Sequence, residues 1–274
     1  MGNRPKKVCF QPLSEEHSIE RFGLIIELSP PLPNNRFSGI ESFVKKNDFL
    51  RAFFNRADRK EYKREHLAVA AKEKPAVQKN KILILTRAAP QKEWELYIDQ
   101  RRVAIYCFNY TRWAHVSCTI IDILNSIATS VLQRNVQNIL MGYIDIFLLS
   151  GQDHDVVDAK KLISPKSKYI SHQFFNANLS IETSIKTVKK IKETNRLVGE
   201  NFSIELKEYK NSLAYFIDTN HELRLNNEKI VLSTQKGLKK KYIKEIIDML
   251  HEENKKLLGN ILAPSILKKI GMEG

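Results

Sequence analysis

Residues 109–118, NYTRWAHVSC, mark the point where we expect a strand to end and a long helix to begin. Thr111 is of a type that caps helix N-termini. From Trp113 onward, apolar residues recur at helical spacing, at Val116, Ile120, Leu124, Ile127 and Val131. We therefore predict a helix from Thr111 to about residue 134. Because Trp113 is in phase with this apolar stripe, we interpret YTRW as a structural corner and not as a platform for stacking bases.

Strands are predicted on both sides of this helix. The segments EWELYID (93–99) and RRVAIYCFNY (101–110) alternate apolar and polar residues, and the turn between them lies at Asp99–Gln100. Further strands are expected at 22–28, before a run of prolines, at 81–87 and at 138–151. A helix with a break near Asn47–Asp48 is expected over 37–54, and a charged helix running into a loop over 55–80.

The C-terminal part repeats the plan of strands followed by a helix. Strands are expected near 201–210, 212–225 and 228–233, and a long helix from Thr234 to about Leu258. Short helices are expected at 183–195, which is rich in lysine, and at 263–271. The fold class expected is α+β, in two similar halves, each an antiparallel sheet followed by a long amphipathic helix packed on one face. The division would be a flexible arm at 1–20, halves at 21–150 and 169–274, and a linker at 151–168.

Composition narrows the class of protein. The chain has 274 residues, with 45 Lys and Arg against 31 Asp and Glu, hence a net charge of +14. Such a field attracts polyanions. The three cysteines have no metal-ligand spacing, and neither a signal peptide nor a long apolar run is present. We expect a cytoplasmic protein with reduced thiols and no membrane contact.

Motifs for nucleotide or metal chemistry are missing from the sequence: no P-loop, no GxGxxG, no HExxH and no GxSxG occurs. Asp153, His154, Asp155 and Asp158 lie close together, but we expect a solvated acidic linker there instead of a metal site. No cofactor, metal ion or catalytic residue is therefore predicted.

Basic clusters are the main candidate for a binding site. One holds Arg51, Arg56, Arg59, Lys60, Lys63 and Arg64, and another holds Lys239, Lys240 and Lys241. The second lies at a predicted helix N-terminus, where cations oppose the helix dipole. A sequence that places three lysines there indicates a use for positive charge, and the helix N–H groups would add to an anion site. We expect both clusters to contact phosphates.

The sequence resembles a sporadically distributed, uncharacterised family of prokaryotic proteins of about this length. The resemblance rests on Tyr110-Thr111-Arg112-Trp113 opening a helix and on Leu250-His251-Glu252 in the last long helix. The family's Gly-x-Arg-Tyr strand is Gly142-Tyr143-Ile144-Asp145 here, so no role of that arginine carries over. The patchy distribution implies a link to mobile or antiviral defence loci, by association only.

The function expected from these observations is that of a non-enzymatic accessory or regulatory subunit that binds nucleic acid, or a protein partner that acts on nucleic acid. One alternative is a metal-independent ribonuclease of the CRISPR repeat-processing type, with His115 or His251 as the acid–base group. The other is an antitoxin or scaffold that binds only protein. Oligomeric state and the choice between RNA and DNA stay open.

Overall fold

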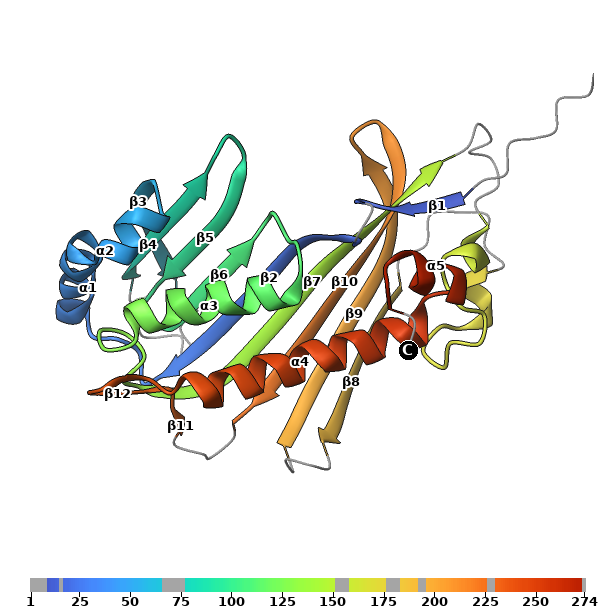
Figure 1. Ribbon diagram of the computed structural model, residues 1–274. Helices are drawn as coiled ribbons and strands as arrows, with labels where there is room; N and C mark the ends of the chain where they lie inside the picture. The colour runs from blue at the N-terminus through green and yellow to red at the C-terminus, as the bar shows by residue number, and fades with distance from the viewer. Residues whose placement is uncertain are drawn as a thin grey trace, which may run out of the picture.

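The computed structural model describes residues 9–14, 17–65, 77–150, 158–175, 183–191, 196–225 and 230–272. These residues form one large antiparallel sheet with helices on one of its faces (Figure 1). The strands of the sheet are β1 (Cys9–Pro12), β2 (Ile19–Ser29), β3 (Arg56–Glu65), β4 (Val77–Ala88), β5 (Lys92–Ile98), β6 (Arg102–Cys107), β7 (Asn135–Ser150), β8 (Thr183–Ile191), β9 (Arg196–Tyr209), β10 (Ser212–Arg224) and β11 (Ile230–Val231).

The strands β2 and β7 pair with each other at the centre of the sheet. The order is β3-β4-β5-β6-β2-β7-β10-β9-β8, and β1 and β11 pair with the two ends of β7. A separate small ribbon joins β12 (Ser233–Thr234) and β13 (Gly237–Leu238). Because successive side chains of a strand point to opposite faces, every strand divides its residues between a helix-covered face and an open face.

The helices are α1 (Asn34–Lys46), α2 (Asp48–Phe53), α3 (Trp113–Ile127), α4 (Lys240–Ile261) and α5 (Pro264–Lys269), with short 3₁₀ turns η1 (Ala159–Lys161) and η2 (His172–Phe175). Figure 1 shows α3 and α4 lying across the same face of the sheet, with α1 and α2 at one end and α5 at the other. Their buried residues pack against the helix-side residues of the strands, in two hydrophobic clusters. Among the described residues, the opposite face carries no helix.

The expected fold class, two similar halves that each have their own sheet and long helix, is wrong, because the sheet is continuous. Its strand β7 pairs along both edges: Asp145 is opposite Ile19 of β2 and also opposite Ile217 of β10. The pattern of 138–151 predicts a strand but not its neighbours, so we expected it to close a first half. In the structure β7 is instead a central strand, which pairs with β2 along one edge and with β10 along the other. The described helices other than α4 are also short; α3 has 15 residues.

Local predictions were right where apolar periodicity is strong. The break between α1 and α2 is at Asn47, whose side chain accepts a hydrogen bond from the Leu50 N–H at 2.9 Å. Helix α3 is confirmed, but it ends at Ile127 instead of near residue 134, and its N-cap is Arg112, without a side-chain hydrogen bond, instead of Thr111. Helix α5 and the β5–β6 hairpin are also confirmed.

Two predicted helices are strands. The charged segment after residue 55 forms β3 and, after an interval outside the described residues, β4. The lysine-rich segment near 183–195 forms β8. Both β3 and β8 are edge strands, which natural sheets protect with charged side chains, and that charge hides the strand pattern. In β8 the β-branched residues Thr183, Ile185, Thr187 and Val188 were the better signal.

No helix of the described residues has the length and apolar character needed to cross a lipid bilayer.

Candidate nucleic-acid interface

The first predicted basic cluster is divided by the structure. Arg51 lies exposed on α2, whereas the other members lie on β3. Arg56 and Lys60 are opposite Thr86 and Ile82 of β4, which places them on the open face. Arg59 lies on the other face and forms an ion pair with Glu41 of α1 at 3.3 Å.

The remaining two members of that cluster, Lys63 and Arg64, lie on β3, but their side chains are outside the described residues. The predicted cluster is thus not one surface: only part of it shares a face of the sheet.

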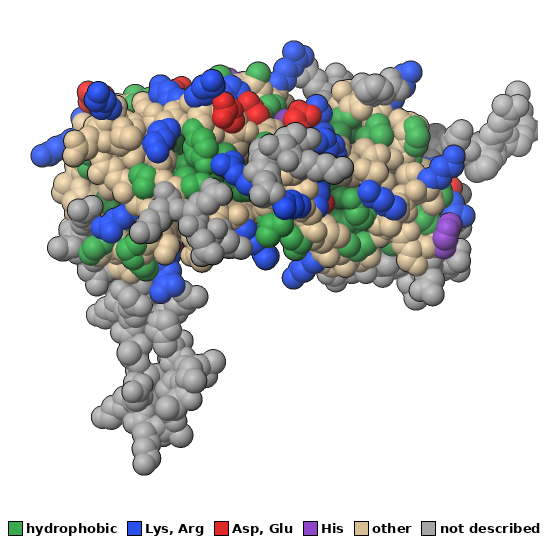
Figure 2. Space-filling view, turned by 90° about the horizontal axis from the view of Figure 1, so that it is seen from below, with side chains coloured by type: hydrophobic (Ala, Val, Ile, Leu, Met, Phe, Trp, Pro, Cys, Tyr) green, Lys and Arg blue, Asp and Glu red, His purple; other side chains and the backbone are tan. Residues whose placement is uncertain are grey.

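The second predicted cluster stays together. Lys239, Lys240 and Lys241 are exposed around the start of α4, beside Tyr242 and Glu245. This helix has no acidic residue in its first turn. Figure 2, the view from below, shows Lys and Arg side chains spread over that surface with Asp and Glu among them. The charge of the protein is therefore distributed, and phosphate contacts at Lys239–Lys241 stay a prediction.

The YTRW corner lies against α4. Trp113 stacks on His251 with ring centroids 4.3 Å apart and planes at 13°, and its Nε1 donates to Asp248 at 2.9 Å. On its other side, His251 Nδ1 is 2.9 Å from the hydroxyl of the fully buried Tyr143. Burial lowers the pKa of His251 to about 4. These contacts join α3, β7 and α4.

The two histidines considered for ribonuclease chemistry are not brought together. His115 is exposed in the first turn of α3, whereas His251 is stacked inside the corner. No described interaction links the two.

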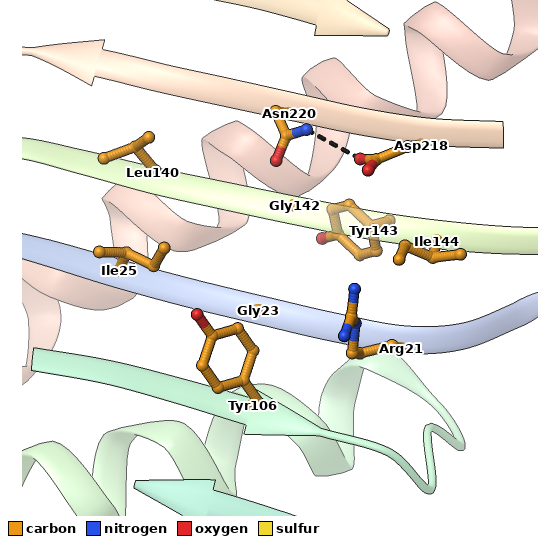
Figure 3. Close-up of a pocket in the computed structure, with 10 residues that line it drawn as sticks. All are labelled: Arg21, Gly23, Ile25, Tyr106, Leu140, Gly142, Tyr143, Ile144, Asp218 and Asn220. Atoms are coloured by element: carbon orange, nitrogen blue, oxygen red, sulfur yellow. Dashed lines mark hydrogen bonds between the residues drawn. The ribbon is translucent and has the colours of Figure 1, made fainter. Parts of the chain in front are cut away.

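The open face of the sheet has a different character, because a row of four paired residues crosses its centre. Tyr106 of β6 is opposite Gly23 of β2, Gly23 is opposite Gly142 of β7, and Gly142 is opposite Asn220 of β10. The two adjacent glycines leave a notch with a volume of about 100 Å³. Figure 3 shows Tyr106 on one side of this notch and Asn220 on the other.

A side chain at either glycine would displace its neighbour from the present position. A Cβ at Gly23 would lie 3.0 Å from two ring carbons of Tyr106, and a Cβ at Gly142 would collide with the Asn220 side-chain oxygen. Apolar side chains flank the notch along the strands, Ile25 and Leu140 at one end and Ile144 at the other (Figure 3). A glycine in a strand interior weakens the strand and often marks close approach of a ligand or another chain segment.

Aromatic side chains lie on both sides of the notch. Tyr106 contacts Tyr97 edge-on at 5.5 Å between ring centroids, and it contacts Phe108 at 6.4 Å. Beyond the other side, Phe216 of β10 contacts Tyr209 of β9 at 5.7 Å. We call these five residues the aromatic track; all are partly exposed.

Cations lie over several rings of the aromatic track. Lys92 Nζ is 4.9 Å from the Phe108 centroid, and Lys207 Nζ is 4.1 Å from the Phe216 centroid. Exposed Arg21 borders the notch, and exposed Lys186 lies farther out on β8. The open face thus combines aromatic rings with basic side chains.

Acidic side chains on the open face are mostly paired. Lys92, Arg102, Lys207 and Arg224 form ion pairs with Glu95, Asp99, Glu205 and Glu222 at 2.6–3.0 Å. Asp218 differs, because it borders the notch and accepts a hydrogen bond from Asn220 Nδ2 at 2.8 Å. Burial raises the pKa of Asp218, while Asn220, Arg21 and Lys207 act in the opposite direction.

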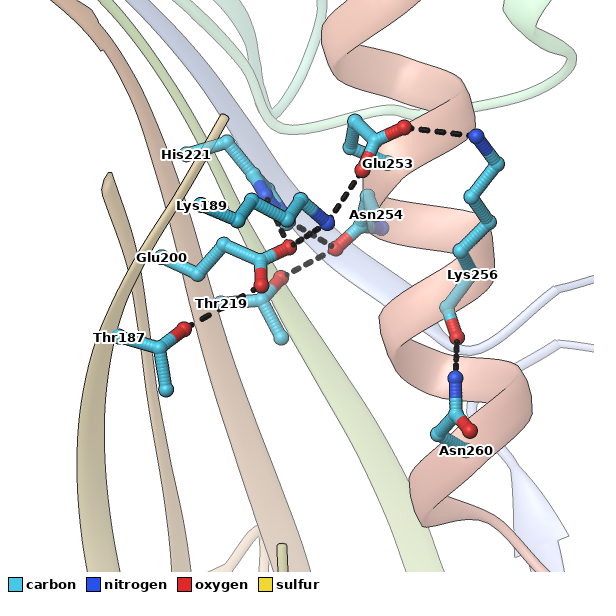
Figure 4. Close-up of polar contacts among 9 residues, drawn as sticks. All are labelled: Thr187, Lys189, Glu200, Thr219, His221, Glu253, Asn254, Lys256 and Asn260. Atoms are coloured by element: carbon cyan, nitrogen blue, oxygen red, sulfur yellow. Dashed lines mark hydrogen bonds and ion pairs between the residues drawn. The ribbon is translucent and has the colours of Figure 1, made fainter. Parts of the chain in front are cut away.

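A buried polar group lies on the other face, beneath α4 (Figure 4). Lys189 of β8 contacts Glu200 of β9 at 2.6 Å and also the carboxylate of Glu253 on α4. Fully buried His221 lies 3.2 Å from Asn254 through Nε2. Burial alone would raise the pKa of Glu200, but hydrogen bonds from His221 and Lys189 outweigh it and lower the pKa to about 2. Most of these polar groups form hydrogen bonds or ion pairs with one another, which is typical of a structural network.

Sequence reasoning did not predict the notch or the aromatic track. The signal was present as glycines inside two predicted strands, Gly23 and Gly142, which the turn chemistry of glycine does not explain. What the sequence does not supply is the register that places the two glycines side by side. Comparison of the chain with protein-family models, with curated proteins and with solved structures gives no match.

Proposed function

We propose that this protein binds single-stranded nucleic acid across the open face of its sheet, as a non-enzymatic accessory subunit. The observation that supports this most is the aromatic track, which is partly exposed on the face of the sheet that the described helices leave open, with cations over its rings. Unpaired bases stack on aromatic side chains, at about 1–3 kcal/mol per base, and every base has a face that can stack. A duplex hides those faces, so the track favours a single strand.

Charge on the open face agrees with this occupant. Arg21 and Lys186 are exposed there, and Arg56 and Lys60 lie on the same face along β3. These cations are placed to contact phosphates while the bases contact the rings. A protein that docked on this face would have to bury the ion pairs Lys92–Glu95 and Lys207–Glu205, whereas charged residues are depleted at the cores of protein interfaces.

The test is a titration of fluorescent single-stranded RNA, single-stranded DNA and duplex into the purified full-length protein, read by anisotropy. We expect single strands to bind more tightly than duplex. Replacing Tyr106 and Phe108 together by alanine should weaken binding by tenfold or more, since two stacking contacts are removed. Phe49→Ala is the matched control, because Phe49 is 37% exposed on α2, away from the open face.

Thermal unfolding of each variant separates loss of binding from loss of fold. The proposal fails if no single strand binds at low salt, or if the Tyr106/Phe108 variant is folded and binds like the wild type. Stable capture of one protein without nucleic acid would instead favour the scaffold alternative.

A further inference from the structure

The notch has the hydrogen-bonding pattern of a site for one particular base. Its volume of about 100 Å³ is small. Pockets for whole drug-sized molecules have about 300–1,000 Å³. One group of a larger ligand fits this notch better than a complete small molecule does. Under the proposed function, that group is a single base lying between Tyr106 and Asn220 (Figure 3).

One side of the notch offers acceptors. A carboxylate can only accept hydrogen bonds, so the Asn220 amide must turn its NH₂ toward Asp218, as the 2.8 Å contact shows. This orientation turns the Asn220 oxygen toward Gly142, where it occupies the space that a Cβ would need. The Asn220 oxygen and the Asp218 carboxylate therefore form a pair of neighbouring acceptors at the rim.

Hydrogen-bond donors lie at one end of the notch. Arg21 borders the notch beside Ile144, and its guanidinium presents several N–H groups in one plane. Arginine pairs with the guanine O6 and N7 atoms in the commonest specific protein–base contact.

Guanine matches this arrangement best among the four bases. Its N1–H and N2–H₂ groups are two adjacent donors for the two acceptors, and its O6 is an acceptor next to them. Adenine and cytosine each present one amino donor beside a ring acceptor on the same edge, and uracil presents one N–H between two acceptors. Each of these would leave an acceptor facing an acceptor, which is unfavourable in a partly buried site.

We infer that the notch between Tyr106 and Asn220 recognises a guanine base, with Arg21 donating to its O6, Asp218 accepting from its N1–H and Asn220 accepting from its N2–H₂; Arg21 and Asp218 share one row of the sheet, and Asn220 lies in the next row. This rests on the proposed function for the source of the base, which is a guanosine within a single strand. A free guanine nucleotide carries the same base, and the experiment distinguishes the two sources.

The experiment uses heptameric uridine strands whose central residue is guanosine, inosine, adenosine, cytidine or uridine, together with GMP alone. We expect the guanosine heptamer to bind at least tenfold more tightly than the adenosine, cytidine and uridine heptamers. Inosine, which lacks the N2 amino group, should fall between them. One good bidentate contact contributes about 1–3 kcal/mol of discrimination, so a tenfold preference is within reach.

Two variants test the notch itself. Asp218→Asn replaces an acceptor by an amide, and Gly142→Ala displaces the Asn220 oxygen, because a Cβ at Gly142 would collide with it. Each should abolish the preference for the guanosine heptamer over the other heptamers. Gly259→Ala is the matched control, because a Cβ at that position in α4 meets nothing within 4 Å.

The outcomes separate the two proposals. Equal binding of all heptamers would overturn the guanine assignment and leave single-strand binding in place. Binding of GMP without binding of any strand would support the base site and overturn the strand as its source. A preference that persists in a folded Asp218→Asn variant would also overturn the assignment.

Discussion

At the scale of single residues, His251 shows how burial sets the charge state of the YTRW corner. Its ring lies between Trp113 and the Tyr143 hydroxyl, and burial lowers its pKa to about 4. In the unfolded chain a histidine titrates near 6.5. The neutral imidazole is therefore the form that the fold holds. The stability that His251 contributes is present above pH 6.5 and is lost as the pH falls toward 4.

We predict that His251→Gln flattens the acid limb of the stability curve. Between pH 7 and pH 4.5 the wild type should lose roughly 2 kcal/mol more free energy of unfolding than the variant does, by linkage to the lowered pKa. Urea unfolding followed by circular dichroism at both pH values measures this difference.

Buried Asp145 makes the comparison between variants necessary. Burial raises the pKa of Asp145 to about 6. As the pH falls below about 6, protonation of Asp145 therefore stabilises the folded protein, over part of the same range in which protonation of His251 destabilises it. Tyr143→Phe keeps the imidazole and should retain the wild-type pH dependence. Parallel curves for wild type and His251→Gln would contradict the prediction.

At the scale of elements, the Lys189 group holds two strands to a helix. Strands β8 and β9 lie at one edge of the sheet, and Lys189 connects both to α4 through Glu200 and Glu253. The side chains of Glu200 and Glu253 are only 3% and 7% exposed. Removing the lysine would leave two buried carboxylates without their shared cation, which costs more than the ion pairs themselves contribute.

We predict that Lys189→Met destabilises the protein by roughly 2–3 kcal/mol, somewhat less than for a fully buried pair because the Lys189 side chain is 35% exposed. Lys186→Met is the control: it lies on the same strand but faces the open side, and its effect should stay within about 0.5 kcal/mol. Chemical denaturation measures both. If the unpaired carboxylate is the cause, the double variant Lys189→Met/Glu200→Gln should recover part of the free energy of unfolding that Lys189→Met loses. Equal effects of Lys189→Met and Lys186→Met would argue against this cause.

The helices and strands also differ in how well the sequence pattern predicts them. Helix α3 and strands β2 and β7 were predictable because one or both of their faces are strongly apolar. Strands β3 and β8 were not, because an edge strand has few apolar neighbours and carries charges that protect it from further pairing. The candidate site was the least predictable part. It depends on the pairing of Gly23 with Gly142, and pairing partners are not encoded in local periodicity.

At the scale of the whole molecule, the net charge of +14 is spread over many elements. A polyanion in contact with such a surface releases counterions from each neutralised phosphate, which makes affinity fall steeply as salt rises. The basic residues at Lys239–Lys241 lie at the start of α4, apart from the open face. They should therefore affect the strength of binding but not the choice of base.

We predict that changing Lys239, Lys240 and Lys241 together to glutamine weakens single-strand binding and reduces the slope of log affinity against log salt by up to about 2, at roughly 0.7 per phosphate contact. Anisotropy titrations from low to moderate salt measure the slope. Lys45→Gln/Lys46→Gln, two exposed lysines at the end of α1, serves as the control for charge alone. An unchanged slope in the triple variant would remove these lysines from the interface.

The central strand β7 has a consequence for how the chain reaches its native state. Cys9 contacts Ser150 across 141 residues of sequence, and β7 completes its other edge only with β10. Contacts of such long range slow folding, because much chain entropy is lost before they form. During synthesis β7 leaves the ribosome before β10 exists, so the backbone N–H and C=O groups along one edge of β7 have no partner strand until β10 emerges. We expect the nascent chain to depend on chaperones until about residue 224 has emerged, and fragments cut within 151–168 to aggregate instead of folding separately.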